Sequence, residues 1–142
     1  MSPRGAPAVT ALLVLTAVGT ATYWVGFFFG GDTLHAGEDA VYLGFEHAFP
    51  AADAWMAGAA AATAVGLVRR RPWALAAGIA AGSALVFLGL IDVLFDLEHG
   101  MYARGSTAVA AELVINVYCL TVGPFLMVWF WRRREHFVAS RR

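Results

Sequence analysis

Carboxylic acid side chains interrupt the most apolar stretches of this sequence. Asp53, Asp92, Asp96 and Glu112 each lie within or at the end of a long hydrophobic run, and Glu46 comes shortly before one. An isolated carboxylate is costly to bury, so such groups hold a proton, bind a cation or pair with another charge. Because crowded carboxylates cannot all ionise, we expect at least one to stay protonated near neutral pH. The chemistry open to them is cation binding or proton transfer.

Two sets of polar residues have the spacing of a helix face. They are Asp92, Asp96 and His99 in one segment, and Glu112, Asn116 and Cys119 in another. Residues at such spacings share one side of a helix. Carboxylates together with imidazole suit a divalent metal ion, so Asp92, Asp96 and His99 are candidate metal ligands. The sequence has no Cys/His cluster or HExxH motif that would identify a dedicated metal site.

Aromatic residues occur at a depth similar to that of the acids. These are Tyr23, Trp24, Phe27 and Trp55. Aromatic walls with a few polar groups suit an amphipathic small molecule or lipid, and carboxylates and aromatic faces both attract a cationic headgroup. The predicted ligand-binding residues, with His47 and His99 as further candidates, are Tyr23, Trp24, Phe27, Glu46, Trp55, Asp96 and Asn116.

An enzyme active site is an alternative use of the same carboxyls. Asp53, Asp92 and Glu112 would be the catalytic residues, with Asn116 orienting them. A neutral acid beside a charged one can protonate one atom of a substrate and accept a proton from another. Isomerisation or cyclisation of a lipid-soluble substrate needs little more. A third alternative is an accessory subunit of a membrane complex, in which the acids would pair with arginines of a partner.

Four apolar segments must position these side chains. The chain has 142 residues, of which 60% are hydrophobic and only 14% charged, and its mean hydropathy is +0.66. Soluble domains carry about 25% charged residues, whereas a helix of about 20 apolar residues crosses a bilayer core of about 30 Å. Because backbone groups in lipid must bond within their own segment, the spans should be helices. The predicted helices are 8–29, 49–68, 73–97 and 108–131.

The arginines indicate how these helices are oriented. Nine of the ten fall at one end of the predicted spans, namely Arg4, the run at 69–71 and five in the segment 132–142. The positive-inside rule makes that side cytoplasmic. We therefore predict a single all-α domain over 1–142, a polytopic, antiparallel bundle of four transmembrane helices in the cytoplasmic (inner) membrane. Both termini should be cytoplasmic, with 132–142 forming a basic tail.

The acids gather at the opposite end of the predicted spans. Asp32, Glu38 and Asp39 fall in a connection and should be solvated, while the acids within the helices should meet at one depth near the outer surface. Turning those acids toward lipid would be costly, so we expect a shared, hydrated, outward-open pocket. Tyr42 and Tyr102 suit the aromatic belt at the outer face of the membrane.

Small residues predict which helices approach closely. The segments 49–68 and 73–97 are rich in Gly and Ala, which favours their packing as a hairpin. No glycine-rich phosphate loop is present and the arginines lie at membrane borders, so nucleic acid is not an expected partner. The expected partners are membrane lipids and a small hydrophobic or cationic ligand. A homo-oligomer and a membrane-complex partner both stay open.

Overall fold

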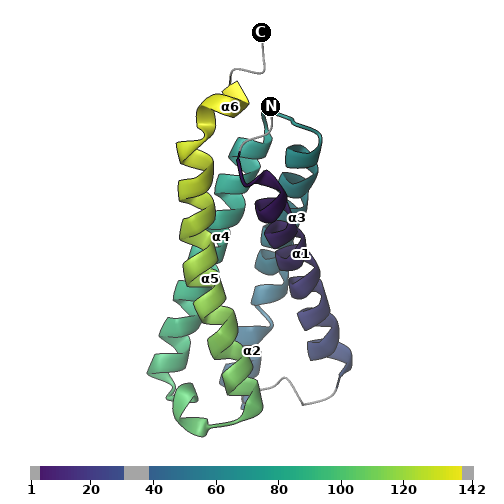
Figure 1. Cartoon of the computed structure of the whole chain (residues 1–142). Coiled ribbons are helices and arrows are strands. Elements are labelled where there is room, and N and C mark those ends of the chain that lie inside the picture. Colours follow the sequence, from purple (N-terminus) through teal and green to yellow (C-terminus); the bar gives the residue numbers. More distant parts are fainter. Residues whose placement is uncertain (1–3, 31–38, 139–142) are drawn as a thin grey trace.

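The computed structural model of the chain describes residues 4–30 and 39–138. Every regular element within them is helical. In chain order the elements are α1 (Ala6–Phe29), α2 (Ala40–Glu46), α3 (Phe49–Val68), α4 (Ala74–Glu98), the 3-10 helix η2 (Met101–Arg104), α5 (Thr107–Arg132) and α6 (Arg134–Val138). The four long helices α1, α3, α4 and α5 run alongside one another (Figure 1).

The long helices have the length and composition of membrane spans. Within residues 4–30 and 39–138 there are four such helices, and the span that contains α3 also includes α2. The bounds of α1, α3, α4 and α5 differ from the predicted ones by at most two residues, so the prediction of four membrane-span-like helices is confirmed. Their outward surfaces carry large apolar side chains such as Val18, Leu94 and Val114, which are 58%, 57% and 69% exposed. Large exposed apolar side chains on several helices suit contact with lipid rather than water.

Glycines allow α4 and α5 to approach closely. A β-carbon built at Gly82 would lie 2.7 Å from the carbonyl oxygen of Gly123, and one built at Gly123 would lie 2.8 Å from that of Gly82. Gly78 faces Phe130 of α5, and Gly89 also faces α5. Although α4 packs against α3 as well, these three glycines of α4 serve its contact with α5. The predicted packing of α3 against α4 is present, and Gly66 of α3 faces Ala74 of α4, but the glycines of α4 face α5 in addition.

Helix α3 lies between α1 and α4 and packs against both. Leu13, Ala60 and Leu85, one from each of these helices, are at most 1% exposed and belong to the same apolar core. A side-chain contact of 2.6 Å between the hydroxyls of Thr16 and Tyr118 connects α1 to α5. The polar groups described below therefore sit on helices that a common core holds in place.

Two short elements, α2 and η2, lie at one end of the molecule (Figure 1). We call it the acidic end; α3 and α5 begin there and α4 ends there. Both segments fall in stretches that the sequence predicts as connections, but α2 is a capped helix. The Asp39 side chain accepts hydrogen bonds from the backbone N–H groups of Val41, at 3.1 Å, and Tyr42, at 2.9 Å. Such a cap supplies partners for N–H groups that a helix start leaves free. The predictions for Asp32 and Glu38 concern residues outside the described part of the chain.

The opposite, arginine end contains the turn at 69–73 between α3 and α4, together with α6 (Figure 1). Phe137 of α6 is buried, and its ring lies 5.7 Å from that of Phe130. The segment predicted as a basic tail thus begins with a short helix that packs on α4 and α5. Arg141 and Arg142 lie outside the described residues.

Candidate functional site

Five carboxyl groups meet inside the acidic end. We call them the carboxylate cluster: Glu46 of α2, Asp53 of α3, Asp92 and Asp96 of α4, and Glu112 of α5. Glu46 is central, because its carboxyl lies within electrostatic range of the other four. Glu46, Asp96 and Glu112 are only 6%, 2% and 4% exposed. The structure thus brings together acids from four helices, three of them in positions with little access to water.

Tyr42 ties α2 to α5 within this cluster. Its hydroxyl donates a hydrogen bond to Glu112 Oε1 at 2.7 Å, and its side chain is 1% exposed. Tyr42 and Glu46 are four residues apart on α2, so both point to the same side of that helix. The prediction of Tyr42 as part of an outer aromatic belt is therefore wrong, because the ring faces the interior.

A second set of polar contacts joins Asn116 of α5 to Asp96 of α4 and to Tyr102 of η2. The Asn116 Nδ2 group donates to Asp96 Oδ2 at 3.2 Å and to the Tyr102 hydroxyl at 3.1 Å. Burial, followed by a hydrogen bond to Asp96, raises the pKa of Tyr102 to about 12, so the hydroxyl stays protonated at neutral pH. Tyr102 is half-buried and its hydroxyl takes part in the site.

The aromatic residues predicted on the first helix line the α1 side of the cluster. Trp24 Nε1 donates to Asp53 Oδ2 at 2.8 Å. Tyr23 is half-buried and lies within electrostatic range of four of the five cluster carboxyls. Phe27 is buried, with its ring 5.2 Å from that of Trp24 and 6.1 Å from that of the exposed His47. Their position agrees with an aromatic wall beside the acids.

Basic side chains do not neutralise this cluster. Asp92 is half-buried and lies within electrostatic range of Glu112 and of Asp96. In the part of the chain that the structure describes, none of the five carboxyls takes part in an ion pair. Arg104 of η2 comes within electrostatic range of Glu112, but its ion pair, at 3.8 Å, is with Asp39 at the surface. The negative charge of the cluster must be balanced by protons or by a bound cation.

Two buried oxygen atoms of the site lack a hydrogen-bond partner within the described structure. They are Glu112 Oε2 and Asn116 Oδ1. Both side chains come from α5, one helical turn apart, and Asn116 is 2% exposed. A buried acceptor left without a donor costs about 1–3 kcal/mol. These two oxygens can therefore accept hydrogen bonds from a donor that the described side chains do not supply.

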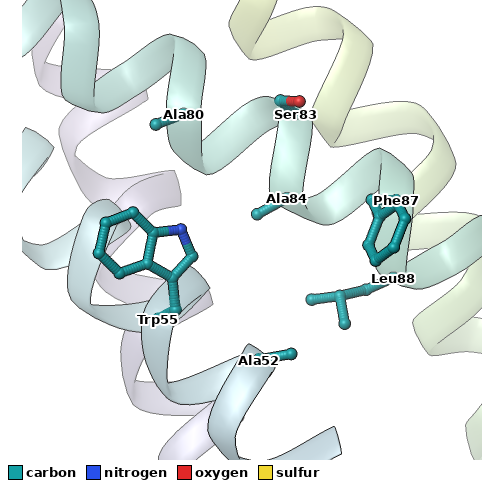
Figure 2. Close-up of a pocket in the computed structure, with 7 residues that line it drawn as sticks. All are labelled: Ala52, Trp55, Ala80, Ser83, Ala84, Phe87 and Leu88. Carbon is teal, nitrogen blue, oxygen red and sulfur yellow. The ribbon is translucent and has the colours of Figure 1, made fainter.

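Trp55 does not belong to the site, contrary to the prediction. It is 70% exposed and lines a groove of about 500 Å³ on the surface of α3 and α4, which Figure 2 shows. The other lining residues are Ala52, Ala80, Ser83, Ala84, Phe87 and Leu88. Trp55 follows Asp53 by two positions, so it points about 200° away around the helix. No carboxylate lines this groove, so it is not the outward-open pocket that the sequence predicts.

The predicted metal ligands do not form a set. His99 is exposed, its ring stacks on Phe95 at 4.1 Å, and its Nδ1 lies 2.9 Å from the Phe95 carbonyl oxygen. Asp96 instead accepts from an amide, as described above. Among residues 4–30 and 39–138, no group of three or more His, Cys, Asp or Glu residues is arranged to hold a metal ion. Shared helix faces therefore did not suffice to bring Asp92, Asp96 and His99 together as ligands.

Tyr42 and Tyr102 are the site residues that the sequence reasoning missed. A signal for Tyr42 was present, since Asp39 is a favourable N-cap and Tyr42 stands four residues before Glu46. Tyr102 lies in a four-residue 3-10 helix, which is too short to show any periodicity.

Comparison with models of protein families, with curated proteins and with solved structures gives no match. The fold itself defines the class: the described part of the chain is all-helical and has four membrane-span-like helices, which indicates a membrane protein.

Proposed function

We propose that this is a multi-pass protein of the cytoplasmic membrane, folded as an antiparallel bundle of four transmembrane helices. The arginines at 69–71 and 132–134 lie at the arginine end, and the carboxylate cluster lies at the other. The positive-inside rule assigns the arginine end, and both termini with it, to the cytoplasm. The carboxylate cluster then occupies the extracytoplasmic half of the membrane.

The function that we propose is binding of a cation, or of the cationic group of an amphipathic molecule, within the carboxylate cluster. One observation carries this proposal: five carboxyls converge, three of them buried, and none of them has an ion pair within the described chain. Acids inside membrane spans are expensive and mark functional sites, because their charge must be compensated. A bound cation compensates several of them at once.

The aromatic residues of α1 support the same proposal. Tyr23 lies within electrostatic range of four cluster carboxyls, and Trp24 is bonded to Asp53. A cation held among these acids would also be attracted by nearby aromatic faces. Membrane lipids and lipid-soluble amines are the molecules that reach a site at this depth most directly.

An acid–base enzyme acting on a lipid-soluble substrate is the second candidate. It is favoured by Glu112, whose Oε1 accepts a hydrogen bond from Tyr42 while its Oε2 is free to exchange a proton. Asp92 and Asp53 would supply the complementary base. Isomerisation or cyclisation would use the same carboxyls, so turnover rather than site location separates the two candidates.

Calorimetric titration of the protein in lipid nanodiscs tests cation binding. The probes are sodium, potassium and calcium chloride and dodecylamine hydrochloride. We expect saturable binding of at least one probe, weakened roughly tenfold or more in Asp96→Asn and in Glu112→Gln, because each loses a buried charge that faces the cation. Glu98→Gln, at the exposed end of α4, is the matched control and should bind like the wild type.

Two other outcomes decide against this proposal. If none of the four probes binds saturably, the cluster does not bind cations. If lipids that copurify with the wild type include a product that is missing from Glu112→Gln, the protein is an enzyme and the second candidate replaces the first.

A further inference from the structure

The two unpartnered oxygens of the site lie on the same buried face of α5. Glu112 and Asn116 are four residues apart, and they are 4% and 2% exposed. The rest of each polar group is engaged: Tyr42 donates to Glu112 Oε1, and Asn116 Nδ2 donates to Asp96. What is left is a pair of buried acceptors without a hydrogen-bond partner in the described structure, Glu112 Oε2 and Asn116 Oδ1.

The orientation of the Asn116 amide follows from its neighbours. Its NH₂ group contacts the Asp96 carboxyl and the Tyr102 hydroxyl. Turning the amide over would place its oxygen against the carboxylate of Asp96, where two acceptors would face each other. Asn116 Oδ1 is therefore an acceptor that lacks a donor. Glu112 Oε2 is the second such atom.

A ligand that satisfies both oxygens has to donate hydrogen bonds, and a positive charge on it would also balance the surrounding carboxyls. Two acceptors one helical turn apart need a donor with at least two N–H or O–H bonds. The surrounding carboxyls have no ion pair within the described chain, and Arg104 is paired with Asp39. No group of three metal-ligating side chains is formed among the described residues. A primary ammonium group meets both requirements, since it has three N–H donors and one positive charge.

We propose that Glu112 Oε2 and Asn116 Oδ1 form the subsite for a protonated primary amine, either the headgroup of a membrane amphiphile or a small water-soluble amine. This inference rests on the cation binding proposed above and specifies its chemistry. Two N–H bonds go to the two free oxygens, and the third faces the remaining acids. A quaternary ammonium has the same charge but no N–H bond, so it cannot satisfy either oxygen.

Comparison of primary and quaternary amines tests this subsite. The protein in lipid nanodiscs is titrated with dodecylamine and with dodecyltrimethylammonium, and separately with methylamine and tetramethylammonium. We expect each primary amine to bind roughly tenfold or more tightly than its quaternary counterpart, because two charge-assisted hydrogen bonds are lost in the latter. Selectivity with the dodecyl pair alone identifies a membrane amphiphile as the source, and selectivity with both pairs identifies the amine group itself.

We expect Glu112→Gln to keep the fold and to abolish the subsite. Its amide oxygen can still accept from Tyr42, and its NH₂ replaces the unpartnered acceptor Oε2 with a donor. We expect this variant to unfold at a temperature no lower than the wild type and to lose the preference for primary amines. Glu98→Gln should retain it.

The outcomes separate this inference from the proposed function. Equal binding of primary and quaternary amines, or binding of metal cations only, overturns the amine subsite and leaves cation binding intact. Binding of no cation overturns both, and a proton or a water molecule then satisfies the two oxygens.

Discussion

The Tyr42–Glu112 hydrogen bond lies in a setting where water cannot replace either partner. Both side chains are almost fully buried, and the second oxygen of Glu112 already lacks a donor. A hydrogen bond in such surroundings is worth more than at the surface, because a lost partner leaves the full desolvation cost behind. Tyr42 therefore connects the stability of α2 to the charge state of the site.

Removing the Tyr42 hydroxyl should destabilise the protein. In Tyr42→Phe both oxygens of Glu112 would be unpartnered, so we expect a loss of about 1–3 kcal/mol in the free energy of unfolding. This loss can be measured by unfolding the protein in detergent while the helical circular dichroism signal is monitored. In a double-mutant cycle, Glu112→Leu, which cannot accept from the Tyr42 hydroxyl, should reduce the effect of Tyr42→Phe. Equal effects in both backgrounds would show that the hydrogen bond contributes little.

At the scale of helices, α4 and α5 are held at a distance that only glycine allows. The carbonyl oxygens of Gly82 and Gly123 occupy the space that β-carbons would need on the facing helix. In lipid, such close contact is a principal source of helix association, since apolar side chains gain nothing by leaving the hydrocarbon. This crossing sets the position of Asp92, Asp96 and Glu112, which lie further along the same two helices.

Gly82→Ala should therefore weaken the packing of α4 on α5. The added methyl group would meet the Gly123 backbone at 2.7 Å, so we expect a loss of about 1–3 kcal/mol in stability. Gly58→Ala is the matched control, because a β-carbon there meets nothing within 4 Å. Thermal unfolding in the same detergent compares the two. A control as destabilised as Gly82→Ala would mean that the crossing is not the cause.

Helix α2 depends on its cap, which should make it sensitive to acid. The hydrogen bond from the Tyr42 N–H, followed by that from Val41 and the attraction of Arg104, lowers the pKa of Asp39. The carboxylate therefore stabilises α2 fully above the unfolded pKa of about 3.9, and this contribution is lost as pH falls through the lower folded value. The amide chemical shifts of Val41 and Tyr42 should follow this transition. In Asp39→Asn, which caps without titrating, they should not.

The helices differ in how far the sequence predicts them. The runs that form α1, α3, α4 and α5 are long and apolar throughout, so their bounds could be predicted closely. Helix α2 has only seven residues and lies inside a polar connection. The sequence indicates it only through the N-cap Asp39 and through Tyr42 and Glu46, which share one helix face. The rotation of α4 about its axis decides which neighbouring helix its glycines contact. Because small residues occur on several faces of α4, the sequence does not define that rotation.

For the whole molecule, charge is separated between the two ends. Apart from Arg104, the described arginines lie near the arginine end or in its turns, while the carboxylate cluster lies at the other end. This separation underlies the proposed orientation in the membrane. Cys119 is the only cysteine and is buried, so single cysteines introduced at the surface can report accessibility against a low background.

The orientation can be checked by cysteine labelling in intact cells. Ala103→Cys in η2 should react with a membrane-impermeant maleimide added outside, because the acidic end faces outward in the proposed topology. Val138→Cys in α6, whose native side chain is 64% exposed, should react only after the cells are permeabilised. The reverse pattern would place the carboxylate cluster on the cytoplasmic side.

Much of the site was predictable from helix spacing and depth. These place Asp53, Asp92, Asp96 and Glu112 at one level, and the structure does bring them together. Rotation about each helix axis was not predictable, which is why Trp55 lies outside the site. The side chains that partner the acids also depend on tertiary contacts that no local pattern encodes, as Tyr102 illustrates.

The most direct test of the account is the location of a bound amine. Dodecylamine with an isotope-labelled nitrogen is added to the protein in bilayers, with carbon-labelled glutamate, and the nitrogen–carbon dipolar coupling is measured by solid-state NMR. The account predicts a coupling to Glu112 Cδ that corresponds to about 4 Å or less, the separation that an N–H···O hydrogen bond imposes. A bound amine coupled only to exposed glutamates such as Glu98 or Glu135, or to none, would contradict it.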